Sequence, residues 1–95
     1  MNKSEILQIL RAHKDEFAKN YGVTVIGLFG SYAKSREVKN SDIDIFAEMP
    51  PKFDLLVHFQ VELEILLKRK IDLVRLREKM NPRLRENILR DGLYA

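Results

Sequence analysis

The segment from Val23 to Phe29 constrains the fold most, because nearly all of it is apolar or β-branched. A segment of this length and composition predicts a central β-strand whose two faces are both covered by other parts of the protein. Gly30 and Ser31 follow and end the strand. The chain has 95 residues, which is enough for one core but not for two. We therefore expect residues 1–95 to form a single domain.

Apolar residues at helical spacing surround this strand in the sequence. Ile6, Leu10 and Phe17 recur at the helical period, and Asn20 to Gly22 is a typical helix end. Alternating helices and strands predict an α/β, or α+β, domain with helices packed against a small sheet. The predicted long helices are 2–22, 53–68 and 82–92, with a short one at 31–36, and the further predicted strands are 43–48 and 71–76.

The composition excludes several classes of protein. Hydrophobic residues make up 45% of the chain and charged residues 33%, which is typical of a globular protein. The absence of cysteine excludes disulfide scaffolds, thiolate zinc sites and thiol catalysis. No apolar run approaches the roughly 20 residues of a membrane span, and no export signal is recognisable, so a cytoplasmic protein is expected. The net charge of +3 is spread along the chain and predicts no nucleic-acid partner.

Three aspartates are the candidate catalytic residues. Asp42 and Asp44 are two residues apart at the start of a predicted strand, so both carboxylates project to the same side of the sheet. Their repulsion needs an offsetting charge, and a divalent cation such as Mg²⁺ supplies it. Asp72 lies in another apolar strand and joins them if the two strands are neighbours. Taken singly, Asp42 could instead cap a turn and Asp72 could face solvent.

Gly30 and Ser31 form a candidate phosphate site, because they lie at a strand-to-helix junction. Glycine allows a phosphate to approach the backbone, and the first N–H groups of a helix have no partner within the helix. Lys34 and Arg36 follow closely and are predicted to contact the same phosphates. The alternative for the glycine and serine is an ordinary loop, and for the two basic residues a solvated loop face.

Gly30-Ser31, ten residues and Asp42-Ile43-Asp44 together resemble the G-S-x10-D-x-D signature of the nucleotidyltransferase superfamily that includes DNA polymerase β. The segments around this signature resemble the MNT family, the minimal nucleotidyltransferases. This resemblance extends to Asp72 and to the C-terminal segment, and it implies a small mixed sheet with helices packed against it. Many MNT proteins are antitoxins that move AMP from ATP to a tyrosine of a HEPN toxin.

The resemblance implies a role for each candidate residue. Asp42, Asp44 and Asp72 would be catalytic and would hold two Mg²⁺ ions, with Mn²⁺ as a substitute. Asp72 would also help to deprotonate the acceptor. Binding of the ATP triphosphate would fall to the two turn residues and the two basic residues after them (Gly30, Ser31, Lys34 and Arg36). The sequence departs from the family at Ser35, where many members have glycine, and this leaves the geometry of the loop open.

Two other functions remain open at the level of sequence. The protein could be a non-catalytic antitoxin that neutralises its toxin by direct binding, or a nucleic-acid-binding module. The intact signature argues against the first, and the lack of a helix-turn-helix or an aromatic platform argues against the second. The acceptor surface would come from the partner protein or from a second copy of the chain.

Overall fold

The computed structural model describes residues 1–95 and contains a four-stranded sheet with the strand order β3-β2-β1-β4. The strands are β1 (Val25–Phe29), β2 (Ile43–Glu48), β3 (Ile71–Arg75) and β4 (Leu93–Tyr94). Strand β1 is antiparallel to β2 and β4, whereas β2 and β3 are parallel. The sheet is therefore mixed, as the resemblance implied, and β3 and β4 form its two edges.

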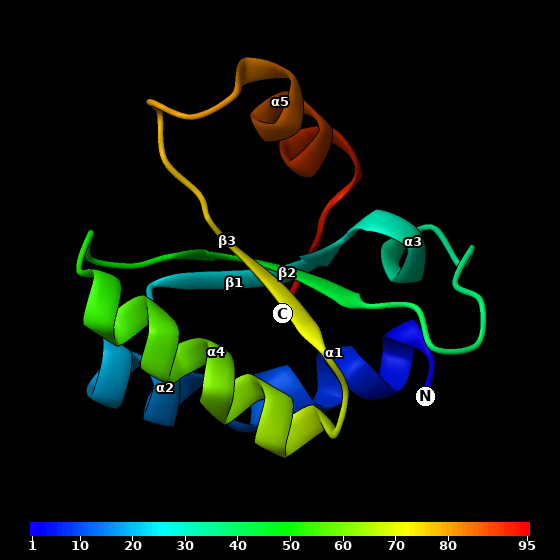
Figure 1. The fold of residues 1–95 in the computed structure, drawn as a ribbon, viewed down its shortest axis with the longest axis horizontal. Coiled ribbons are helices and arrows are strands. Elements are labelled where there is room, and N and C mark those ends of the chain that lie inside the picture. The colour runs from blue at the N-terminus through cyan, green and yellow to red at the C-terminus, as the bar shows by residue number, and fades with distance from the viewer.

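Helices cover both faces of the sheet (Figure 1). On one face lie α1 (Lys3–Ala12), α2 (Lys14–Tyr21) and α4 (Phe53–Leu67), and on the other lies α5 (Pro82–Asp91). The larger core forms beneath the first three helices and contains 17 buried residues. A smaller buried cluster of Phe46, Leu76 and Ile88 lies beneath α5. The prediction that β1 is central and covered on both faces is confirmed.

The prediction of one helix over residues 2–22 is wrong, because His13 interrupts the helix and separates α1 from α2. This residue has φ −111° and ψ 8°, outside the helical region. Its Nδ1 atom lies 2.8 Å from the carbonyl oxygen of Ile9, at the end of α1. The break lets α2 bring Phe17 against Phe59 of α4, with ring centroids 5.0 Å apart. Packing on α4 therefore outweighs the continuous helical pattern.

The sequence prediction also missed β4, which is only two residues long. It forms because α5 returns the chain to the free edge of β1, where Ala95 N–H donates to the Ile26 carbonyl at 2.9 Å. The other predicted elements are present with shifted ends. The short helix α3 is Gly30–Ala33, and α4 ends at Leu67, because Lys68 has φ 55°. None of the helices has the length and apolar character needed to cross a bilayer.

Candidate active site

The sheet register brings the predicted site residues together around Asp44. Strand β2 lies between β1 and β3, and Asp44 is directly opposite Phe29 on one side and Asp72 on the other. Phe29 is followed at once by Gly30, the first residue of the candidate phosphate turn. The condition for Asp72 to join the other aspartates is met, because β3 pairs directly with β2.

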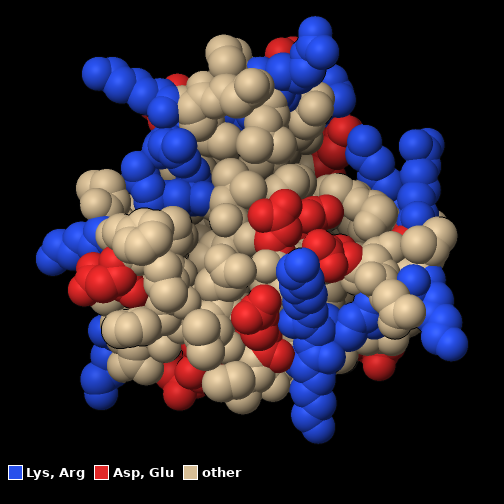
Figure 2. All heavy atoms as spheres, in the orientation of Figure 1, with Lys and Arg blue, Asp and Glu red and all other residues tan.

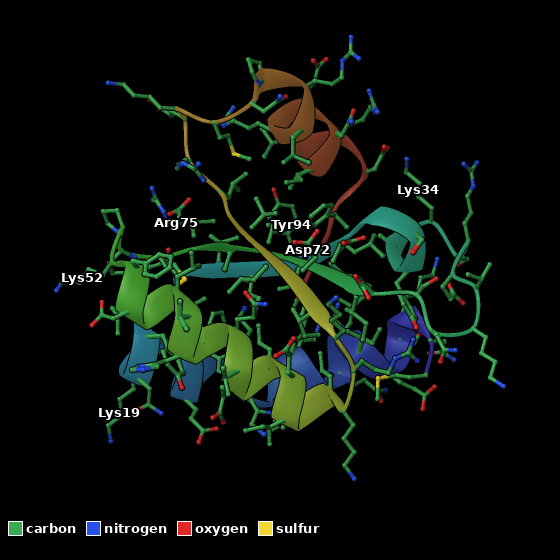
Figure 3. All side chains as sticks on the ribbon, viewed as in Figure 1. Lys19, Lys34, Lys52, Asp72, Arg75 and Tyr94 are labelled. Atoms are coloured by element: carbon green, nitrogen blue, oxygen red, sulfur yellow. The ribbon has the colours of Figure 1, made fainter.

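The three aspartates lie on the face of the sheet that α5 covers only in part. Alternation along β2 places Asp44 on the same face as Phe46, which packs under α5. Asp44 is half-buried, whereas Asp42 and Asp72 are exposed on either side of it. Figure 2 shows acidic side chains gathered near the middle of this view of the molecule, where Figure 3 labels Asp72. The arrangement is an acidic site that is open to large molecules.

Asp44 is the electrostatic centre of this site. Its burial raises its pKa to about 6, and the charge of Asp72, a hydrogen bond with Asp72 and the charge of Asp42 act in the same direction. The neighbouring carboxylates therefore disfavour the charged form of Asp44. A cation bound here would relieve the same repulsion between the carboxylates.

The chemistry of these donors fits a divalent cation, although the side chains do not form a finished cage. No group of three or more acidic, histidine or cysteine side chains has the spacing of a complete metal site. Magnesium, however, commonly takes one or two carboxylates and completes its shell with water and substrate phosphates. Asp44 and Asp72, with Asp42 beside them, therefore supply the type and the charge of ligand that Mg²⁺ prefers.

Gly30 is required at its position by sterics. It has φ +72°, a conformation that L side chains rarely adopt. A Cβ atom at this position would collide with the Oδ2 atom of Asp44 and would lie 2.9 Å from its Cγ atom. The absence of a side chain thus lets the Asp44 carboxylate lie directly against the Gly-Ser turn. The turn and the acidic site are in this way parts of one surface.

The other predicted phosphate contacts lie on α3 and the loop after it. The Ser31 carbonyl accepts a 2.8 Å hydrogen bond from Arg36 N–H, which closes the turn, and the Arg36 side chain is exposed. Lys34 projects toward α5 (Figure 3), where its Nζ atom lies 3.5 Å from Asp91 Oδ2. Arg90 first and Lys34 second hold the pKa of Asp91 below its usual range. An exposed ion pair of this kind is weak, so Lys34 is free to exchange Asp91 for a phosphate.

Arg69 is a site residue that the sequence prediction missed. Its Nη2 atom donates a 2.7 Å hydrogen bond to the carbonyl of Ser41, the residue before Asp42. Its guanidinium also lies over the ring of Tyr32 in α3, 6.0 Å from the centroid. Tyr32 itself is buried in the core. Arg69 therefore links the start of β3, the Gly-Ser helix and the loop that carries the first aspartate.

Neither of the two surface hollows of the protein contains any of the three aspartates. The candidate site is instead an open surface between α3, α5 and the N-terminal ends of β2 and β3. An open site of this kind encloses little of a substrate by itself.

Comparison with known proteins identifies the family. The polymerase β nucleotidyltransferase family matches residues 12–94, which include every candidate site residue. The chain belongs to this family. A Methanocaldococcus jannaschii protein, MJ1215, is 47% identical over 75% of this chain and 85% of its own length, and it is named as a candidate protein adenylyltransferase. The Thermococcus cleftensis protein adenylyltransferase MntA is 36% identical over 96% of this chain and 93% of its own.

Solved structures with the same fold support this assignment. A toxin–antitoxin crystal structure with AMP-PNP has a TM-score of 0.71 and 27% identity, covering 99% of this chain and 72% of that one. A complex of the tri-AMPylated Shewanella oneidensis HEPN toxin with an MNT antitoxin has a TM-score of 0.62 and 26% identity, covering 98% and 67%. This nucleotidyltransferase chain is thus similar to proteins that work in toxin–antitoxin pairs.

Proposed function

We propose that this nucleotidyltransferase is an antitoxin that moves AMP from ATP to a tyrosine hydroxyl of a HEPN toxin. The observation that carries the proposal is the juxtaposition of Asp44 with Asp72 and with the Gly30 turn. A nucleotidyl transfer needs a place for the triphosphate beside carboxylates that can serve the attacking oxygen. The relatives named as protein adenylyltransferases and the HEPN toxin complexes support the choice of donor and acceptor.

In this proposal Asp42, Asp44 and Asp72 would hold Mg²⁺, as two ions, and Mn²⁺ would substitute for it. The ions, when bound, neutralise phosphate charge and lower the pKa of the acceptor hydroxyl. Asp44 would bind an ion in its ionised form, and its pKa of about 6 leaves it mostly ionised at pH 7. The chain contributes the fixed positions of the carboxylates, because β2 and β3 hold two of them in register.

The remaining residues orient the donor and accept the proton. The Gly30 turn admits the triphosphate, the Ser31 hydroxyl donates to a phosphate oxygen, and Lys34 and Arg36 neutralise phosphate charge. The acceptor oxygen attacks the α-phosphorus in line, a new oxygen–phosphorus bond forms, and pyrophosphate leaves. Asp72 takes the proton of the attacking hydroxyl, since it is the exposed member of the adjacent pair.

A macromolecular acceptor suits the open shape of the site. The carboxylates lie outside both surface hollows, so a tyrosine on a convex partner can reach them.

The second candidate is an antitoxin that neutralises the toxin by contact alone. Contact requires no pair of carboxylates on neighbouring strands beside a glycine turn, and therefore the Asp44–Asp72 pair favours transfer.

The test is incubation of the protein with ATP labelled at the α-phosphate, Mg²⁺ and its HEPN partner. We expect covalent label on a tyrosine of the partner. No label should form in the presence of EDTA, or with the double variant Asp42→Asn and Asp44→Asn. The folded state of the double variant is checked by circular dichroism. A tight complex that never acquires label would favour the contact-only antitoxin, and transfer by the folded double variant would refute the catalytic assignment.

A further inference from the structure

The outer edge of β3 has a short stretch of backbone without hydrogen-bond partners. Lys70 carbonyl and Leu76 N–H bond to β2, so the even-numbered residues of this segment face β2. The backbone N–H and carbonyl groups of Ile71, Leu73 and Arg75 therefore point away from β2, because backbone groups alternate in direction along a strand. Since β3 is an edge strand, no strand lies on that side. The outward groups must be satisfied by side chains, by water or by another chain.

Side chains satisfy only the two ends of this edge. Gln60 donates to the Ile71 carbonyl at 3.2 Å, and Glu64 accepts from Ile71 N–H at 3.3 Å. At the other end Arg77 donates to the Arg75 carbonyl at 2.7 Å. Between these ends lie the N–H and carbonyl of Leu73 and the N–H of Arg75. The gap offers three backbone groups at the spacing of a β-ladder.

A hollow of about 450 Å³ opens directly beside this gap. Its walls combine apolar side chains with three cations and include no acidic residue. Phe53 at the start of α4 is 80% exposed, although it is a large apolar residue. Figure 3 shows Lys52 and Arg75 projecting on the same side of the molecule, and Figure 2 shows basic atoms gathered there. The residues that matter for binding are Lys52, Phe53, Leu56, Leu73, Arg75 and Arg77.

We propose that this edge and hollow bind an extended acidic segment of a partner protein, which adds a short strand to β3. The free backbone groups recognise a polypeptide strand rather than a nucleic acid, and the three cations select acidic side chains. A second copy of the chain fits poorly, because a two-fold pairing of β3 edges would bring together two grooves that each hold three cations and no acidic residue. This surface lies at the end of β3 opposite Asp72, so it does not depend on the proposed transfer reaction.

The test uses a labelled peptide of alternating glutamate and valine as the probe, titrated into the full-length protein. In NMR spectra, the amide chemical shifts of Leu73 and Arg75 should change as peptide is added and should reach a plateau at high peptide concentration. Charge reversal in Arg75→Glu, and separately in Lys52→Glu, should weaken binding by about tenfold each. Lys39→Glu makes the same change in net charge in the exposed loop before β2, whereas Arg75 pairs with Ala47 at the other end of that strand, and it should leave the affinity unchanged.

A backbone control separates strand addition from simple charge attraction. The same peptide, N-methylated at alternate residues, keeps its charge but cannot form the ladder, and its binding should be lost. Equal binding of the N-methylated peptide would overturn the proposal, as would an absence of shifts at Leu73 and Arg75 at millimolar peptide. Sedimentation that shows the free protein already dimeric through this edge, with Arg75→Glu dissociating it, would overturn it in favour of a second copy.

Discussion

Ser35 has an unusual backbone conformation in the loop between α3 and β2. It has φ 56°, in the left-handed region, and its side chain is exposed. This is the residue at which the sequence departs from the glycine common in the MNT family. A serine in this region costs more than a glycine because its Cβ approaches the neighbouring carbonyl. The loop that positions Asp42 therefore keeps its shape at some cost in stability.

Replacing Ser35 with glycine should stabilise the protein. The relief of strain exceeds the extra freedom that glycine gives the unfolded chain, and the net gain should be about 0.5–1 kcal/mol. Urea unfolding of the parent and of Ser35→Gly measures this gain. Ser35→Ala is the matched control, since alanine has the same Cβ and should bring no gain. Equal stability of the glycine and alanine variants would show that the loop carries no strain at this residue.

Asp44 should make the stability of the metal-free protein depend on pH. Its folded pKa of about 6 lies above the ordinary value of 3.8, so the folded state takes up this proton before the unfolded state does. The contribution to stability is full below pH 3.8 and is lost as the pH rises through 6. In EDTA, the parent should therefore gain stability between pH 7 and pH 5 relative to Asp44→Asn, which has no charge to lose. Identical pH responses of the two proteins would contradict the raised pKa of Asp44.

The sequence predicted the site better where the residues are close together in the chain. Asp42 and Asp44 are separated by one strand residue, so their common side followed from strand geometry alone. The approach of Asp72 depended on which strands are neighbours, and the sequence could only state it as a condition. Arg69 could not be predicted at all, because its role rests on a hydrogen bond to Ser41, 28 residues away.

At the scale of elements, Arg69 joins three parts of the site into one unit. Its replacement by glutamine removes the charged hydrogen bond to the Ser41 carbonyl and the contact with Tyr32. The free energy of unfolding should fall by about 1 kcal/mol, because the residue is only partly buried. Transfer should fall further, by about tenfold, since small displacements of catalytic groups are costly. Lys70→Gln, next in the chain and exposed, is the control for the loss of charge. Transfer by Arg69→Gln at the parent rate would remove Arg69 from the site.

The differences between predicted and observed elements also have physical causes. The apolar pattern of α1 and α2 is continuous through His13, yet the contact between Phe17 and Phe59 requires a change of helix direction. Such a contact with α4 depends on tertiary structure and leaves no local signal. Strand β4 has two residues, which is too short for any alternation to be recognised. The long elements were predictable because each carries its own hydrophobic period.

At the scale of the whole molecule, the acidic site and the basic groove lie at opposite ends of β3. The first is open and rich in carboxylates, and the second is hollowed and rich in cations (Figure 2). Because the two surfaces are separate, a substitution in one should leave the other intact. Transfer and peptide binding are therefore measured separately.

Comparing Asp72→Asn with the parent protein in two assays on the same partner separates chemistry from binding. Mass spectrometry measures the added adenylyl group, and a titration measures the affinity of the complex. Transfer should fall by about a hundredfold or more, because the proton acceptor is lost. Affinity should be nearly unchanged, since the amide has the same shape as the carboxylate. Modification of the partner by Asp72→Asn at the parent rate would contradict the central claim.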